Sequence, residues 1–599
     1  MAEHGEAEGS GKDAPAFDAE ALRARYRAER DKRLRKDGLA QYGHATGEML
    51  EDPYVEPGFT RPAVKEELDV LVIGGGVGGL LAGARLREAG VDDFRIIDKA
   101  GDFGGVWYWN RYPGVACDTE SYIYVPLLDE LGYVPTEKYA KGPEILAHCR
   151  AIGERYRLYD RALFQTKVER MRWDEARLRW IVSTDRGDEI AARFVTMSPG
   201  LLSNPKLPAV PGIETFKGHA FHSSRWDYDY TGGDTYGNLS KLAGKRVGVI
   251  GTGASAVQSI PHIAQWAEHL YVFQRTPAAI PERGNRPTDP DWAKSLKPGW
   301  QKRRMDNFND LTFGYPVNED LVADGWTEIM VKAGPALPPE QRQPADFMLM
   351  EQIRARVDAL VEDPATAAAL KPYYNTLCKR PCFHDAYLQT FNRPNVTLVD
   401  TDGRGVERIT ETGVVVAGQE YELDCLIYAT GFEWITNWTG RNSFEVIGRG
   451  GVVQTEAWRD GVSSYFGMHF RDFPNYFVMG SSQQPSTINF PHILEEMSRH
   501  VAWLIKRCLD EGIAALEPTV EAETAWVEQH MAMTTLRRGF YMDCTPGYYN
   551  DEGQVSSQMA RNSPWGNRPQ EFVRIIEAWR AEGVFAGLEV RRETAKVEA

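Results

Sequence analysis

Two glycine-rich segments of this chain are suited to binding phosphate groups. The first contains Gly74, Gly76 and Gly79, between the apolar run LDVLVI and the helical pattern LLAGARLREAG. In such a turn the first glycine permits a tight bend, the second lets the backbone approach a pyrophosphate, and the third lets helix and strand pack closely. The pyrophosphate then lies at the N-terminus of the helix. The pattern predicts dinucleotide binding, and an ordinary glycine-rich turn is the alternative.

An acidic residue follows at the distance that this reading requires. Asp98 ends the second apolar run, FRIID, 24 residues after Gly74. A carboxylate there can accept hydrogen bonds from the ribose hydroxyls of an adenosine. Strand, glycine turn, helix, strand and acid in this order predict a βαβ unit.

The same order recurs from residue 246, as RVGVI, GTGASA, a helical segment and LYVF. Here the ribose-end acid is missing, and Arg275 and Thr276 follow the second strand. A cation and a hydroxyl suit the 2′-phosphate of NADP, whereas an exposed arginine at a strand end is the alternative. The candidate nucleotide contacts in this turn and its helix are Thr252, Gly253, Ala254, Ser255, Ala256 and Gln258. Two such units predict two nucleotide-binding domains.

Two further segments carry residue types that serve redox cofactors. The stretch GGVWYWNRYPGVACD (104–118) could wall a flat ring with its aromatic side chains and ends in Asp118; a core segment with a Pro-Gly turn is the alternative. The pair Lys379-Arg380 is either an anion site beside a cofactor or a surface basic pair, and spacing does not decide between them. Cys378 and Cys382 lack the spacing of a redox dithiol or a zinc site, so we expect ordinary thiols and no metal.

Composition excludes several classes of protein. The 599 residues carry a formal charge of −16, which disfavours a nucleic-acid partner because phosphate binding needs a basic footprint. Seven scattered cysteines predict reduced thiols in a cytoplasmic protein. The most apolar run, 68–86, is broken by six glycines and two charges, and is not expected to span a membrane.

The order of these patterns predicts an α/β fold with interrupted domains. We expect an N-terminal extension (1–65), the first part of one dinucleotide-binding domain (66–212), a second dinucleotide-binding domain of the NADP type (213–394) with a helical insert at about 285–370, and a return to the first domain with a C-terminal region (395–599). The return rests on the strand-like runs VTLVD, GVVVAG and DCLIYATGF. Within and just beyond the extension, the Pro-marked arm 38–67 is either a solvated tail or a packed cover.

Further residues between and beyond the glycine turns resemble a known family. Phe216-x-Gly218-x₃-His222-x₃-Trp226-Asp227 is similar to the fingerprint of type I Baeyer–Villiger monooxygenases. A second family fingerprint fits Gly104-Gly105-x-Trp107, Tyr112-Pro113-Gly114 and Asp118. The segments 424–432 and Phe473-Pro474-Asn475 also resemble the family, so the resemblance extends from about residue 66 to residue 510.

The resemblance implies two Rossmann-like domains, one binding FAD and the other NADPH, and the oxygenation of ketones to lactones or esters through a C4a-peroxyflavin. It places the catalytic arginine at Arg380 and the active-site acid at Asp118, which we expect to pair with each other. It assigns Lys379 to the 2′-phosphate, together with Arg275 and Thr276, and Asp98 to FAD. The residues that it places around the flavin are Gly105, Val106, Trp107, Trp109 and Tyr124.

The stretch FYMDCTPGYYNDEG (540–553) and the long N-terminal arm resemble the subgroup that oxidises large-ring, polycyclic or steroid-like ketones. For its substrate pocket we expect a lining that includes Trp434, Phe490 and Leu494. A heteroatom monooxygenase is the main alternative, although such enzymes usually carry Phe or Tyr where Trp226 stands. A disulfide reductase lacks its cysteine pair here, and a non-enzymatic scaffold would not need the catalytic set. We expect small-molecule partners, a ketone and O2, and a monomer or small homo-oligomer.

Overall fold

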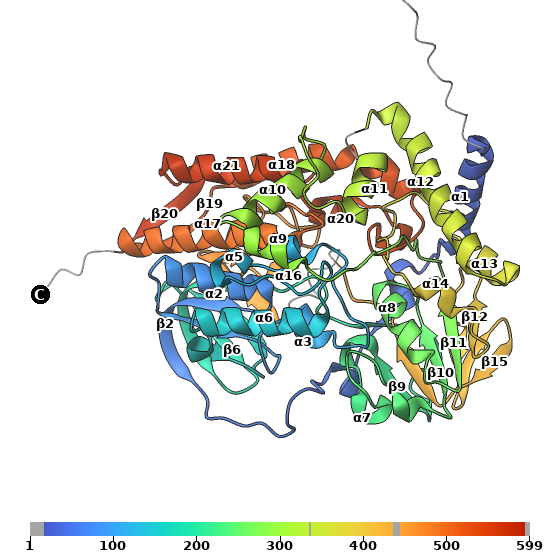
Figure 1. Ribbon diagram of the computed structural model, residues 1–599. Coiled ribbons are helices and arrows are strands. Elements are labelled where there is room, and N and C mark those ends of the chain that lie inside the picture. Colours follow the sequence, from blue (N-terminus) through green and yellow to red (C-terminus); the bar gives the residue numbers. More distant parts are fainter. Residues whose placement is uncertain (1–16, 335–336, 435–443, 594–599) are drawn as a thin grey trace, which may run out of the picture.

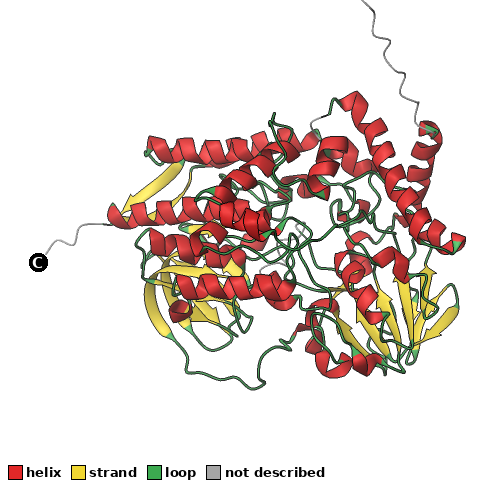
Figure 2. Cartoon of the chain, in the orientation of Figure 1, coloured by secondary structure: helices red, strands yellow, loops and turns green. Residues whose placement is uncertain are grey.

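The computed structural model describes residues 17–334, 337–434 and 444–593. Most of its strands gather in two groups, one at the lower left and one at the lower right of Figure 1, while β19 (Ile513–Pro518) and β20 (Leu588–Arg592) form a separate antiparallel pair at the upper left. Long helices cover the first group from above and border the second (Figure 2). The helices of at least nine residues are α1 (Ala19–Arg33), α2 (Val77–Glu88), α6 (Gly142–Arg155), α8 (Ala254–Ile263), α10 (Trp300–Thr312), α11 (Gly325–Ala333), α12 (Pro339–Leu360), α17 (Phe490–Asp510), α18 (Val520–Thr535) and α21 (Pro569–Glu582).

The first sheet is built around the strands that flank the first glycine turn. β2 and β3 lie parallel, with Val70 beside Phe94, and α2 connects them. The apolar side chains of β2 are buried on both faces, as expected for a central parallel strand covered by helices. The eight strands are β2 (Lys65–Ile73), β3 (Phe94–Ile97), β4 (Ala162–Leu163), β5 (Val168–Asp174), β6 (Arg179–Thr184), β7 (Glu189–Met197), β17 (Glu445–Ile447) and β18 (Tyr476–Val478).

The second sheet is wholly parallel and has the order β12-β11-β10-β16-β9. Its strands are β9 (His219–His222), β10 (Arg246–Ile250), β11 (His269–Gln274), β12 (Val396–Asp400) and β16 (Cys425–Tyr428). A small antiparallel sheet packs on it, formed by β13 (Arg408–Ile409), β14 (Gly413–Val416) and β15 (Gln419–Glu422). Helices α9 (Pro290–Ser295), α10, α11, α12 and α13 (Pro364–Leu370) lie between β11 and β12, where the sequence predicts helices.

This topology corrects the expected return to the first domain at residue 395. The runs VTLVD and DCLIY become β12 and β16 of the second sheet, and GVVV becomes β14 beside it. The first later strand to join the first sheet is β17, which pairs with β5. An apolar run predicts a buried strand, but it does not indicate which of the two sheets that strand will join.

Helix α1 and the start of the arm 38–67 pack on the body of the protein, so the solvated-tail alternative is wrong for the part of the arm around residues 42–44, whereas residues 56–60 of the arm are exposed. The ring of Tyr26 in α1 meets Phe347 of α12 edge to face, with centroids 5.3 Å apart. β1 (Tyr42–His44) pairs with β8 (Lys206–Pro208). In the described part of the chain, every helix is too short or too polar to cross a bilayer.

Candidate active site

One cavity of about 1510 Å³ connects the two glycine turns. The carboxyl ends of parallel strands, where the turns lie, are the usual place for ligands in such folds. All of the predicted site residues line this cavity except Gly79 and Ala256. Those two are buried beneath their turns, so their smallness serves the packing of helix on strand.

The first turn is closed by backbone contacts that admit glycine only. Gly74 adopts a φ of +109°, and a Cβ on Gly79 would lie 1.7 Å from the carbonyl oxygen of Gly74. The backbone of Gly105 crosses the turn so closely that its Cβ would lie 2.7 Å from the Cα of Gly76. This leaves the backbone of the turn and the start of α2 facing the cavity, an arrangement that fits a dinucleotide pyrophosphate.

Asp98 lies where β3 ends, beside this turn. Its carboxylate accepts hydrogen bonds from the amides of Gly75 and, at 2.7 Å, Ala100. Burial raises the pKa of Asp98, while these amides act to lower it. The side chain also lines the cavity, so it can both hold the turn and meet a ribose.

Aromatic rings line the cavity next to the first turn, and one buried arginine packs against them from outside the lining. In α3 (Val106–Trp109), the ring of Trp107 meets Tyr124 edge to face at 5.8 Å. The guanidinium of Arg225 lies 3.8 Å from the ring centroid of Trp109. Arg225 precedes Trp226 of the fingerprint segment 216–227, which we call the linker, so it connects the linker to the candidate flavin site. The sequence analysis did not single out Arg225, although its place inside the fingerprint was a usable signal.

His222 and Trp226 of the fingerprint are fully buried in the linker and outside the cavity lining. The His222 Nε2 lies 3.1 Å from the carbonyl oxygen of Gly431, which follows β16. Burial lowers the pKa of His222 to about 3, with Arg225 adding to the effect, so the imidazole is neutral. These contacts connect the linker to the segment that leads out of the second sheet.

Arg380 and Asp118 form the expected ion pair. Asp118 accepts from the Arg380 Nη2 at 2.5 Å and from Nε at 3.2 Å. The guanidinium also lies 4.9 Å from the ring centroid of Trp326 in α11. Burial acts to lower the pKa of Arg380, but Asp118, together with Tyr548 and Tyr549, more than offsets burial and the pKa is raised. The surface-pair alternative for Lys379-Arg380 is therefore wrong.

The second turn is more open than the first. Gly251 adopts a φ of +119°, but a Cβ on Gly253 would meet no atom within 4 Å. The Thr252 hydroxyl donates to the carbonyl of Thr276 at 2.7 Å. From α8, Gln258 donates to the carbonyl of Ala116 at 3.0 Å. Gln258 thereby connects the second turn to the segment that precedes Asp118.

Charged residues from distant parts of the chain surround Arg275. Its Nη2 lies 3.1 Å from a carboxylate oxygen of Glu552, and the hydroxyl of Thr276 accepts from Arg33 of the extension at 3.0 Å. Lys206 and Lys379 line the same part of the cavity. Sequence reasoning missed Arg33, Lys206 and Glu552, because no local pattern connects them to the second glycine turn. Three cations around one carboxylate form a region suited to a phosphate.

A disulfide corrects the expectation that all cysteines are free. Cys378 bonds to Cys544, 166 residues later in the chain. This bond connects the segment before Lys379-Arg380 to the C-terminal stretch 540–553, which also lines the cavity. The other five cysteines are free and buried, as predicted for Cys382.

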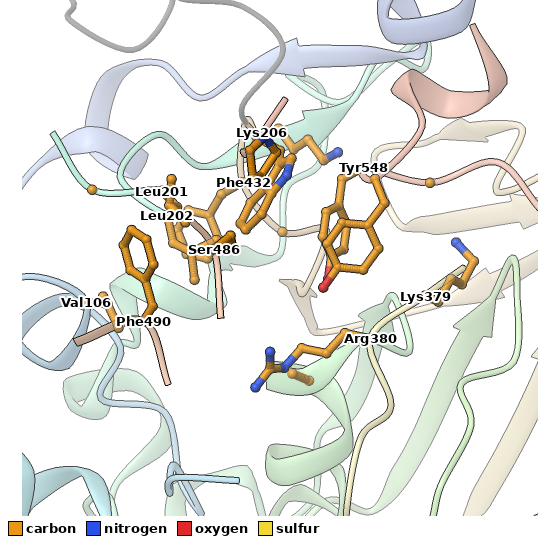
Figure 3. Close-up of a pocket in the computed structure, with 18 of the residues that line it drawn as sticks. Val106, Leu201, Leu202, Lys206, Lys379, Arg380, Phe432, Ser486, Phe490 and Tyr548 are labelled. Atoms are coloured by element: carbon orange, nitrogen blue, oxygen red, sulfur yellow. The ribbon is translucent and has the colours of Figure 1, made fainter. Parts of the chain in front are cut away.

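The wall of the cavity opposite Arg380 is apolar. Figure 3 shows the Arg380 guanidinium pointing into the cavity, with Val106 and Phe490 on the far side. Trp434 and Leu494 also line the cavity, as does Phe490, in agreement with the sequence analysis. Leu201, Leu202 and Phe432 extend this wall, whereas Tyr548 lies on the Arg380 side of the cavity (Figure 3).

Comparisons with known proteins agree with this geometry. Residues 72–131 match the family model described as an NAD(P)-binding Rossmann-like domain. Pentalenolactone D synthase of Streptomyces arenae is 52% identical, covering 96% of this chain and 100% of that protein. Baeyer-Villiger monooxygenase 4 of Dietzia sp. is 48% identical, covering 96% of each.

Solved structures of ketone monooxygenases are also similar to this chain. The polycyclic ketone monooxygenase of Thermothelomyces thermophila superposes with a TM-score of 0.90 at 39% identity, covering 96% of this chain and 99% of that one. A structure described as OTEMO in complex with FAD and NADP superposes with a TM-score of 0.73 at 28% identity, covering 88% and 99%. This chain belongs to the Baeyer–Villiger monooxygenases.

Proposed function

We propose that this enzyme uses FAD, NADPH and O2 to convert polycyclic or large-ring ketones into lactones or esters. The observation that carries the proposal is the Arg380–Asp118 ion pair, which faces a broad apolar wall across a cavity shared by two dinucleotide turns. The name of the structural relative, polycyclic ketone monooxygenase, supports this substrate class.

The residues around each turn fit a different cofactor. The first turn, Asp98 and the rings of Trp107 and Trp109 suit FAD, because they offer a backbone cradle, a ribose acceptor and flat walls. Gly105, Val106 and Tyr124 extend those walls. The second turn suits NADPH, and we assign its 2′-phosphate to Arg275, Thr276 and Lys379. The residues that would hold the rest of NADPH are Thr252, Gly253, Ala254, Ser255 and Gln258, with Ala256 packed beneath them.

Bound FAD supplies the oxygen-activating chemistry, after reduction by bound NADPH. Arg380 binds and polarises the carbonyl oxygen of the substrate, because a guanidinium keeps its charge at every working pH. Asp118 accepts from Nε and Nη2, which leaves the Nη1 hydrogens for an oxygen of the substrate. Donors aimed at a carbonyl oxygen that gains negative charge contribute about 3 kcal/mol, or about a hundredfold in rate.

A substrate panel tests the proposal. Cyclohexanone, cyclododecanone and fused tri- and tetracyclic ketones are each supplied with NADPH, and NADPH oxidation and product mass are recorded. We expect kcat/KM to rise with ring size, because the larger ketones cover more of the apolar wall. A kcat/KM that is highest with cyclohexanone would contradict the proposal of a polycyclic or large-ring substrate.

A substitution at Arg380 tests the catalytic role separately. Arg380→Ala should retain bound FAD, seen in its visible spectrum, and lose ester formation by about a hundredfold or more. Ester yield at the level of the unchanged enzyme would refute the role of Arg380.

The assembly and location follow the same proposal. We assign a monomer or a small homo-oligomer in the cytoplasm; the five free, buried cysteines support this location, and the Cys378–Cys544 bond is the exception. Light scattering on the purified enzyme and fractionation of the producing cells test the two assignments.

A further inference from the structure

Glu552 is a buried carboxylate surrounded by cations. It is 2% exposed, and it accepts from Arg275 and from the Tyr42 hydroxyl, both at 3.1 Å. Burial alone would raise the pKa of Glu552, but Arg275, Lys379 and Lys206 together hold it below its usual range. The carboxylate is therefore charged, and it occupies the centre of the region that suits a phosphate.

The Glu552 carboxylate comes from a segment far from both glycine turns in the sequence. Glu552 belongs to the C-terminal segment, where it and Asp551 adopt left-handed φ values of +55° and +51°. Such values are uncommon outside glycine, and they persist only where surrounding contacts hold them. The side chain of Asn550 provides such contacts, accepting from the amides of Gly547 at 3.0 Å and Gly553 at 3.2 Å.

The N-terminal extension closes the same region from the other side. The Tyr42 hydroxyl donates to Glu552. The ammonium of Lys206 lies over the Tyr42 ring, 3.7 Å from the ring centroid. The Gln41 side chain accepts from the Arg275 guanidinium. The N-terminal extension and the segment around Glu552 thus meet at Arg275, with the Glu552 carboxylate as the anion between them.

We propose that Glu552 is an internal competitor of the 2′-phosphate of NADPH. A phosphate bound to Arg275, Lys379 and Lys206 would approach the Glu552 carboxylate, and like charges at that distance repel. The phosphate carries more charge and more acceptor oxygens than a carboxylate, so it displaces Glu552 and loosens the C-terminal segment from the extension. Glu552 thereby sets how tightly the 2′-phosphate is held. This inference rests on the proposed function, because it takes Arg275 as the ligand of that phosphate.

Binding measured without turnover tests the inference. Full-length, FAD-loaded enzyme is titrated calorimetrically with 2′,5′-ADP, which carries the 2′-phosphate, and with 5′-AMP, which lacks it. Glu552→Gln should tighten 2′,5′-ADP about tenfold, within the usual range of coupling between sites, and leave 5′-AMP unchanged. Asp543→Asn is the matched control: it removes a carboxylate of the same segment that is 69% exposed, and it should change neither affinity.

A second variant and a second readout keep the test decisive. Tyr42→Phe removes one donor to Glu552 without changing any charge, and should tighten 2′,5′-ADP by a smaller factor. Hydrogen exchange in residues 544–553 should rise when 2′,5′-ADP binds and stay constant with 5′-AMP. Unchanged or weaker 2′,5′-ADP binding in Glu552→Gln, or constant exchange in this segment, overturns the inference.

Arg275→Ala separates this failure from a failure of the proposed function. If Arg275 binds the 2′-phosphate, this variant should lose most of its preference for 2′,5′-ADP over 5′-AMP. A retained preference removes the phosphate assignment and the role of Glu552 with it. A lost preference together with an unresponsive Glu552→Gln removes only the role of Glu552.

Discussion

The two glycine turns share a sequence pattern and differ in their surroundings. At the first turn, the backbone leaves no room beside Gly79 or Gly105, and backbone amides hold the Asp98 carboxylate. At the second, the space beside Gly253 is open. Charged side chains from the N-terminal extension and from the segment 540–553, including Arg33 and Glu552, approach it.

The difference suits the first turn to a ligand that stays bound and the second turn to a ligand that is exchanged. A rigid cradle of backbone groups binds without rearranging, which favours a cofactor that stays in place. A site that pairs its cations with an internal carboxylate must exchange one anion for another, which favours a ligand that enters and leaves. The pattern of glycines alone does not distinguish the two cases; the neighbours of the turns do.

The largest expected effect comes from adding one methyl group to the first turn. Gly79→Ala drives a Cβ into the Gly74 carbonyl oxygen, which requires the backbone to shift and costs about 2 kcal/mol or more. We expect protein purified without flavin and with a lower melting temperature. Visible absorbance and thermal unfolding measure both.

Gly253→Ala adds the same methyl group at the second turn, at the position equivalent to Gly76, because Ala256 already stands at the position equivalent to Gly79. Its Cβ meets no protein atom, so flavin content and melting temperature should remain unchanged. NADPH affinity should fall, because the methyl group obstructs the approach of a pyrophosphate to the backbone. Equal flavin loss in both variants would abolish the contrast between the turns.

A smaller effect is expected where the two domains meet, at Asp118. Asp118→Asn removes the charge that orients Arg380 and keeps the size of the side chain. Loss of a charged hydrogen bond of this kind costs about 1.5–3 kcal/mol, so ester formation should fall by about ten- to a hundredfold with flavin still bound. The measurement is ester produced per NADPH consumed. An unchanged ratio and rate would show that Arg380 holds its position without Asp118.

The sequence predicted the parts of this site that depend on short-range geometry. A strand, a glycine turn and a helix form within some thirty residues of chain, so Gly74, Asp98 and Arg275 could be recognised from spacing. The family resemblance then placed Arg380 and Asp118, which lie 262 residues apart and pair as expected.

Long-range partners were not predictable in this way. The Cys378–Cys544 bond and the meeting of Arg275 with Glu552 join residues 166 and 277 positions apart. The apolar run that becomes β16 did not indicate which sheet it would join, because a buried parallel strand has the same apolar pattern in either sheet. Pairing between distant segments depends on the finished topology, which local pattern does not contain.

The smallest expected effect is a pH dependence confined to the second turn. Burial above all, with a contribution from Arg275, lowers the pKa of Lys379 to about 7 and that of Lys206 to about 8. Both amines are charged below these values and attract a 2′-phosphate, and both lose charge above them. Affinity for 2′,5′-ADP should therefore fall several-fold between about pH 7 and about pH 9, a range in which the phosphate itself is already ionised, while 5′-AMP binding stays constant. Lys379→Arg keeps its charge throughout and should flatten the profile; a decline as steep as that of the unchanged enzyme would exclude Lys379 as its source.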